Sequence, residues 1–161
     1  MVEFIFTVRD DPPEDGYSLG DLEVLGKSGS VTTRGLERPD QRMMVYPSAA
    51  ALLSEARLLA SRGKGNGRFE GFGSMFVVEF SLQKDRVATR HGKKIIDSTP
   101  LSDFLYTIYD SVRTLHGHGV FAIEENRKIL NLLEKEIDSF EVWLTSFGIK
   151  HEKSNDRRKR F

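Results

Sequence analysis

The segment from Phe76 to Asp97 restricts the fold of this chain more than any other part of the sequence. Its first part places apolar side chains at every second position, with mostly polar residues between them. These apolar residues are Phe76, Val78, Phe80 and Leu82. Two tight turns, Lys84-Asp85 and His91-Gly92, separate this part from two further strand-like segments. The period of two predicts an antiparallel meander of three strands with one buried face.

The residues before the meander supply further strand candidates. Val2 to Val8 alternates in the same way, and the two prolines of Asp10–Gly16 end it, because proline fixes φ and removes a backbone donor. Shorter strand-like pieces lie at Leu22–Leu25, Ser30–Thr33 and Met43–Tyr46. The closely spaced glycines from Gly63 to Gly67 predict a flexible loop.

Three segments have the apolar spacing and the composition of helices: Ala49–Arg62, Leu101–Leu115 and Ala122–Ser146. Ser48 is predicted to cap the first of them, and the HGHG sequence of His116–Gly119 is predicted to break the second. Strands therefore precede helices without regular alternation. This order predicts an α+β fold, in which an antiparallel sheet of about five to seven strands has about three helices packed mainly on one face.

Length and composition set the domain organisation. A chain of 161 residues, 39% of them hydrophobic, fits one domain, which we assign to residues 1–150. Residues 151–161 are basic and lack apolar periodicity, so they are predicted to form a flexible tail. The N-terminal segment lacks the features of a signal peptide, and no stretch approaches the roughly 20 apolar residues of a membrane helix. The chain is therefore predicted to be soluble and cytoplasmic, with no membrane partner.

Charge and residue content exclude several function classes. The chain contains no cysteine, which excludes a disulfide scaffold, a cysteine-based zinc site and a thiol nucleophile. Its formal net charge is zero, whereas a dedicated nucleic-acid binder carries a strong basic excess. The basic run Arg157–Arg160 still leaves binding of nucleic acid through the tail as an alternative.

No motif for catalysis, for a cofactor or for a metal ion stands out. The glycines of Gly63–Gly73 lack the spacing of a phosphate-binding loop, and no serine lies in a G-x-S-x-G sequence. His116 and His118 are two residues apart and would point to different sides of a helix. Glu70 and Glu79, nine residues apart, would lie on opposite faces of a single strand. We therefore predict no catalytic, cofactor-binding or metal-binding residue, and an enzyme with a dispersed site remains an alternative.

Separated charge clusters favour protein–protein recognition instead. Residues 1–50 carry a net charge of −4 and residues 51–100 a net charge of +4. Such an arrangement suits binding to a partner of complementary charge. An acidic cluster of candidate partner-binding residues comprises Asp10, Asp11, Glu14 and Asp15. A basic cluster comprises Arg90, His91, Lys93 and Lys94.

The order of the segments resembles that of a known class of proteins. MMVYPSAAALLSEARLL (Met43–Leu59) is followed by a glycine-rich loop, by FGSMFVVEFSLQKDRVATRHGKKI (Phe72–Ile95) and by TPLSDFLYTIYDSVRTL (Thr99–Leu115). This layout, over residues 22–115, looks like the small α+β immunity proteins that bacteria encode beside polymorphic or contact-dependent toxins. The resemblance implies a protein without chemistry of its own that binds a cognate toxin domain and blocks the toxin's active site.

The resemblance consists of hydrophobic patterning and segment order, so it assigns no role to any single residue. Immunity proteins that neutralise basic nucleases are often strongly acidic, and the zero net charge of this chain departs from that pattern. The sequence as a whole predicts a non-enzymatic protein–protein recognition module, with neutralisation of a bacterial toxin as its specific form. Its oligomeric state is left open.

Overall fold

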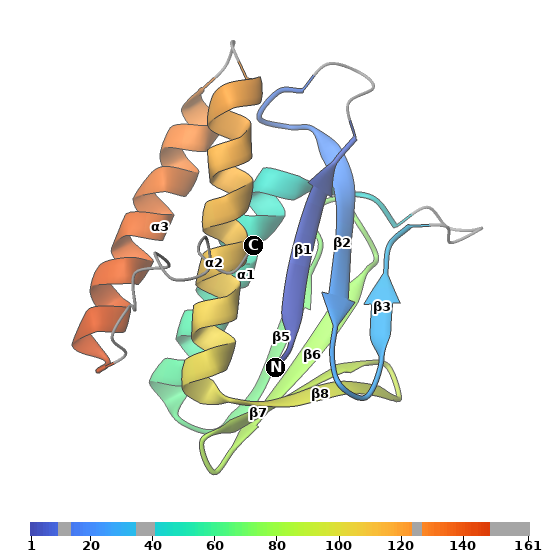
Figure 1. Ribbon diagram of the computed structural model, residues 1–161, viewed down its shortest axis with the longest axis vertical. Helices are drawn as coiled ribbons and strands as arrows, with labels where there is room; N and C mark the ends of the chain where they lie inside the picture. The colour runs from blue at the N-terminus through green and yellow to red at the C-terminus, as the bar shows by residue number, and fades with distance from the viewer. Residues whose placement is uncertain (10–13, 35–40, 124–126, 149–161) are drawn as a thin grey trace, which may run out of the picture.

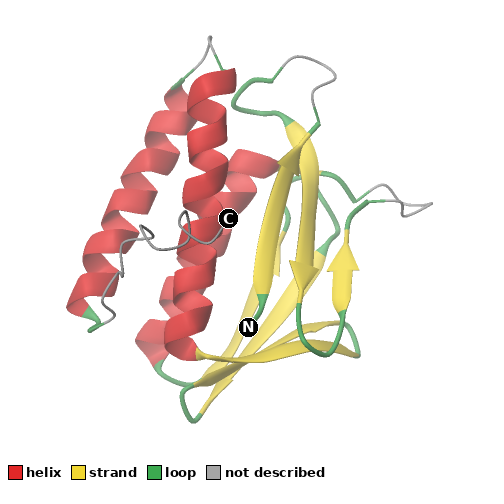
Figure 2. Cartoon of the chain, in the orientation of Figure 1, coloured by secondary structure: helices red, strands yellow, loops and turns green. Residues whose placement is uncertain are grey.

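The chain folds into three helices and eight strands in the computed structural model, which describes residues 1–9, 14–34, 41–123 and 127–148 (Figures 1 and 2). The predicted α+β class is confirmed. In chain order the elements are β1 (Glu3–Val8), β2 (Leu19–Leu25), β3 (Ser30–Thr32), β4 (Met43–Met44), α1 (Val45–Arg62), β5 (Gly65–Glu70), β6 (Val77–Gln83), β7 (Arg86–His91), β8 (Lys94–Pro100), α2 (Leu101–Ala122) and α3 (Lys128–Ser146).

The strands are divided between two antiparallel sheets, where the sequence predicted one. The first sheet has the order β1–β2–β3, with β4 also paired to β2, and the second is the meander β5–β6–β7–β8. The two sheets meet where the turn after β2 lies on β8: Ser28 N–H donates to the Ile96 carbonyl oxygen at 2.9 Å. Burial on one face gives the same alternation in either arrangement, so the sequence pattern does not distinguish one sheet from two.

The core lies between both sheets and the helices. Three aromatic rings, one from each of β1, β6 and α2, meet edge to face at its centre: Phe4, Phe80 and Phe104. α1 and α2 pack against the strands, and α3 packs on α1 and α2 on the side away from the sheets (Figure 1). Among the described residues, no helix packs on the opposite face of the second sheet.

Three predicted helix boundaries are wrong. The third helix begins at Lys128 and not at Ala122, which is the last residue of α2. α1 begins at Val45, so Ser48 lies inside its first turn, and its hydroxyl accepts a hydrogen bond from Phe72 N–H at 2.8 Å. α2 continues through His116–Gly119 to Ala122. Gly119 is required there because a Cβ at this position would lie 2.9 Å from the hydroxyl of the buried Tyr46. Gly119 was predicted to break the helix, but its lack of a side chain instead allows α2 to pack closely against Tyr46.

The predicted flexible loop at Gly63–Gly67 is also wrong in its second half. Gly65 to Glu70 form β5, which pairs with β6 over six residues. The helix before it ends at Arg62, and Gly63 adopts a left-handed φ of 75° that reverses the chain. Phe69, fully buried, anchors the strand in the core. Tertiary pairing and one aromatic side chain thus override the local preference of a glycine-rich segment.

A buried carboxylate stabilises the first sheet. Asp21 on β2 is 3% exposed and accepts hydrogen bonds from Arg9 at 2.9 and 3.0 Å and from the Thr33 hydroxyl at 2.8 Å. Arg34 lies 3.5 Å from its second oxygen. Burial by itself raises the pKa of Asp21, but the hydrogen bonds from Arg9 and Thr33 and the two positive charges outweigh it, so the pKa lies below its ordinary value.

We expect Asp21→Asn to lower the free energy of unfolding at pH 7 by about 1–2 kcal/mol, because both guanidinium partners are partly solvated. Since the folded pKa lies below the unfolded one, this stabilisation is present above about pH 4 and is lost as the pH falls through the folded pKa. Urea unfolding of both proteins between pH 7 and pH 3 checks this. A stability difference that does not shrink with acid would contradict the assignment.

Candidate functional site

The edges of the two sheets differ in how they are covered. On β1, the Ser111 hydroxyl of α2 donates to the Phe4 carbonyl oxygen at 2.6 Å. The turn after β2 covers β8 through the bond from Ser28 to Ile96. β3 and β4 are only three and two residues long. Short edges, and an edge that a turn covers, prevent unwanted strand pairing. The outer edge of β1 is bonded at Phe4 alone, and the described residues supply no partner for the outward backbone groups of Phe6 and Val8.

The outer edge of β5 is also largely open. Gly71 N–H donates to the Phe76 carbonyl oxygen at 3.0 Å, which continues the ladder between β5 and β6. Because alternate residues of an antiparallel strand bond to the same neighbour, Phe69 also bonds to β6, whereas Arg68 and Glu70 direct their N–H and C=O groups away from it. No strand pairs with this side of β5 within the described residues.

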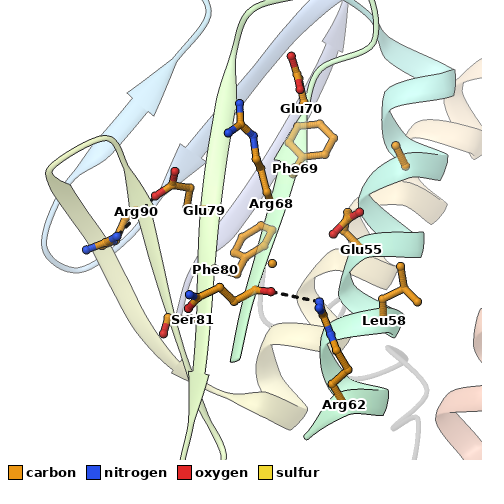
Figure 3. A pocket seen from close by; sticks show the side chains of 13 residues that line it. Glu55, Leu58, Arg62, Arg68, Phe69, Glu70, Glu79, Phe80, Ser81 and Arg90 are labelled. Carbon is orange, nitrogen blue, oxygen red and sulfur yellow. Dashed lines mark hydrogen bonds and ion pairs between the residues drawn. The ribbon is translucent and has the colours of Figure 1, made fainter. Parts of the chain in front are cut away.

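Only one backbone group on this edge has a partner among the residues that the structure describes. Arg62, in the last turn of α1, donates to the Asn66 carbonyl oxygen at 3.1 Å. This bond closes the end of the edge where α1 turns into β5 (Figure 3). At the other end, the described residues supply no partner for the outward N–H and C=O groups of Arg68 and Glu70.

A groove of about 840 Å³ runs along this edge. One wall is a stripe of α1, from which Glu55 and Arg62 extend toward the strands in Figure 3. Its members follow helical spacing: Ala51, Glu55, Leu58 and Arg62. The floor is the face of β5, β6 and β7 that no helix covers. The groove thus joins an open strand edge to a helix face.

Charged side chains of both signs line the groove in equal number. The acidic ones are Glu55, Glu70 and Glu79, and the basic ones are Arg62, Arg68 and Arg90. Three of them form a row across the floor, because Arg68 lies opposite Glu79 and Glu79 opposite Arg90. The Arg90–Glu79 pair is 3.5 Å apart with both side chains nearly half exposed, so it is weak and free to exchange partners.

One large apolar side chain is exposed in the groove. Leu58 on α1 is 53% exposed, whereas Phe69 and Phe80 at the floor are buried in the core. An exposed apolar residue among charges of both signs is typical of an interface, in which it supplies burial and the charges supply specificity.

The predicted basic cluster is only partly gathered here. Arg90 lines the groove. His91 places Nδ1 2.8 Å from the Val77 carbonyl oxygen and stacks on the Phe76 ring, so it has a packing role. Lys94 donates to the Ser30 carbonyl oxygen at 2.6 Å, which ties β8 to β3. Lys93 is exposed in the turn between β7 and β8.

The predicted acidic cluster is divided as well. Asp10 and Asp11 lie outside the described residues. The Glu14 side chain, 5% exposed, accepts a hydrogen bond from the Tyr46 hydroxyl and lies 3.2 Å from His118 Nε2. Burial, and next the bond to Glu14, raise the pKa of Tyr46. Asp15 is exposed and accepts from Tyr17 N–H at 2.8 Å.

A second groove, of about 560 Å³, lies between β1 and α2. His118 lines one end of it, and the contact between Ser111 and Phe4 brings α2 directly against the strand edge.

The described residues contain no group of three histidine or acidic side chains placed to hold a metal ion. Within the same residues, no helix is both long and apolar enough to span a bilayer.

Sequence reasoning missed the residues that define the first groove. Glu70 and Glu79 were considered on one strand, but they lie on adjacent strands and line the same groove. A signal for this strand was available in the sequence Arg68-Phe69-Glu70, where two charged residues flank an aromatic one with the period of a strand.

No protein-family model, curated protein sequence or solved structure matches the chain. The fold and the groove alone therefore define its class, an α+β domain with an open strand edge at β5.

Proposed function

We propose that this protein is a recognition module that binds a partner protein in the groove beside β5. The observation that carries the proposal is the open stretch of β5 at Arg68 and Glu70, for whose outward backbone groups the described residues supply no partner. Exposed edges promote aggregation and are normally protected. An edge left open between a helix wall and a mixed-charge floor is best explained by a partner that covers it.

The resemblance to bacterial immunity proteins supports a specific form of the proposal. In this form the partner is a toxin domain, and the bound protein blocks the toxin's active site without chemistry of its own. The equal numbers of acidic and basic side chains in the groove favour a partner surface that also carries both signs.

Charge reversal in the groove tests the proposal. Tagged wild-type protein, the double variant Glu55→Lys with Arg68→Glu, and the control Lys93→Glu are used to purify partners from the native cells at low and high salt. We expect wild type and control to retain one protein in a one-to-one complex. With that protein purified, the double variant should bind at least about 100-fold more weakly, because two interface charges become repulsive.

Two results would contradict the proposal. A partner that binds the groove variant as tightly as wild type must use another surface. Nucleic acid that elutes at low salt and is lost at high salt, and whose binding disappears when residues 157–161 are deleted, would favour the alternative of a basic tail.

A further inference from the structure

The geometry points to strand addition as the mode of binding: we propose that an extended segment of the partner pairs antiparallel with β5. The segment places a basic residue opposite Glu70, an apolar residue next, and an acidic residue opposite Arg68. This inference rests on the proposed function and specifies which part of the partner the groove accepts.

The backbone of β5 carries the first step of the argument. Arg68 and Glu70 each direct one N–H and one C=O group into the groove, and the described residues supply no partner for them. A residue opposite each in an antiparallel strand would exchange two hydrogen bonds with it. Peptides bind to open sheet edges through such main-chain bonds, and side chains at alternate positions give specificity.

The side chains carry the second step. Arg68 and Glu70 both point to the helix-free face of the sheet, and a residue directly opposite either one places its side chain on that same face. Opposite charges at such positions attract each other, and like charges repel. The partner therefore needs an acidic residue opposite Arg68 and a basic residue opposite Glu70, two positions apart.

The α1 wall selects the residue between these two. Because side chains of a strand alternate, this residue points to the other face, toward the helix. There the exposed Leu58 and the small Ala51 line the groove. An apolar side chain at this position buries the exposed surface of Leu58. In an antiparallel segment the three residues read basic, apolar, acidic from the N-terminus.

A second copy of this chain is the competing occupant. Its own Arg68-Phe69-Glu70 reads basic, apolar, acidic, so β5 matches its own edge in charge. Each copy, however, carries α1 beside β5, and a dimer would have to accommodate both helices at the shared edge. A single extended segment meets no such obstacle, and the observations therefore favour it.

A displayed library of random peptides of about ten residues, selected on the full chain, tests the inference, since this length forms an ordinary strand. We expect enriched peptides to share the order basic, apolar, acidic. The double variant Arg68→Glu with Glu70→Arg should select the reverse order and bind the wild-type peptide at least about 50-fold more weakly. Arg86→Glu, on the same sheet face but outside the groove, is the control and should leave the selection unchanged.

Two single variants separate the backbone from the side chain. Arg68→Gln removes the charge and keeps the edge N–H, whereas Arg68→Pro also removes that N–H, which takes no part in the pairing with β6. We expect binding of the selected peptide to weaken about tenfold in the first variant and more than about 100-fold in the second. Circular dichroism and thermal unfolding verify that both variants fold.

Amide hydrogen exchange of the complex identifies the binding mode. Bound peptide should slow exchange at Arg68 and Glu70 at least about tenfold, because these amides gain partners. Peptides that bind the groove without this protection, or an enriched set without the charge order, would overturn strand addition and leave groove recognition in place. Recovery of no peptide would overturn strand addition too. Concentration-dependent dimerisation that Arg68→Glu abolishes would overturn it in favour of the second copy.

Discussion

Phe104→Ala is expected to lower the free energy of unfolding by about 3–5 kcal/mol, because it leaves a cavity in a well-packed core. Phe104 is fully buried, and its ring meets Phe80 at 5.0 Å and Phe4 at 6.3 Å, both edge to face. These rings come from α2, β6 and β1. The substitution therefore removes the contact that joins a helix to both sheets.

Phe121→Ala on the same helix is the matched control. Phe121 is 91% exposed, so its replacement should change the free energy of unfolding by less than about 0.5 kcal/mol. Chemical denaturation monitored by circular dichroism measures both variants. Equal effects at the two positions would show that the aromatic cluster is not the centre of the core.

Gly26→Ala is expected to destabilise the protein by about 3 kcal/mol, at the upper end of the usual range for overpacking. A Cβ at Gly26 would lie 2.2 Å from the Ile96 carbonyl oxygen and 2.7 Å from its carbonyl carbon. Both atoms belong to the backbone of β8, so a side-chain rotation cannot relieve the clash. The change should push the first sheet away from the second and weaken the bond from Ser28 to Ile96.

Gly117→Ala is the control variant, for which we expect the opposite change in stability. Gly117 lies inside α2, and among the described residues no atom outside the backbone of its own helix turn lies within 4 Å of the position that its Cβ would occupy. Alanine there should stabilise the protein by up to about 1 kcal/mol, because it has the higher helix propensity. Thermal unfolding of the two variants distinguishes the effects, and a loss of stability in both would contradict the close approach at Gly26.

The regular elements could be predicted where one periodicity ran without interruption. β1 and the meander β6–β7–β8 follow the period of two closely enough that their positions were predicted to within a few residues. The apolar stripe of α3 was also predicted, and Leu133, Ile137 and Phe140 from it are buried. In each case burial of one face is enough to specify the element, and no distant partner is needed.

Glycine-containing segments were predicted wrongly for a common reason. In α2, the glycines of His116–Gly119 read as a break, but contact with Tyr46 requires a residue without a side chain at Gly119. In β5, Gly65 and Gly67 read as a loop, but pairing with β6 holds them extended. Glycine permits many conformations, so its actual conformation depends on neighbours that are distant in the sequence.

The candidate site was the least predictable part of the molecule. The sequence drew attention to acidic and basic clusters, of which Arg90 lines the groove. Glu14 instead contacts Tyr46 and His118, and His91 packs on Phe76. A run of charged residues shows that charge is present in a segment. Whether a given side chain faces a partner or a neighbouring element depends on packing.

The sequence by itself determined the α+β class, the meander and the absence of thiol chemistry, because these follow from local periodicity and composition. Tertiary structure alone decided that the strands form two sheets and that β5 is a strand. It also decided that, within the described residues, no strand pairs with the outer edge of β5 beside α1. An open edge is defined by which segments do not pair with it, and pairing between segments far apart in the chain leaves no periodic signal in the sequence.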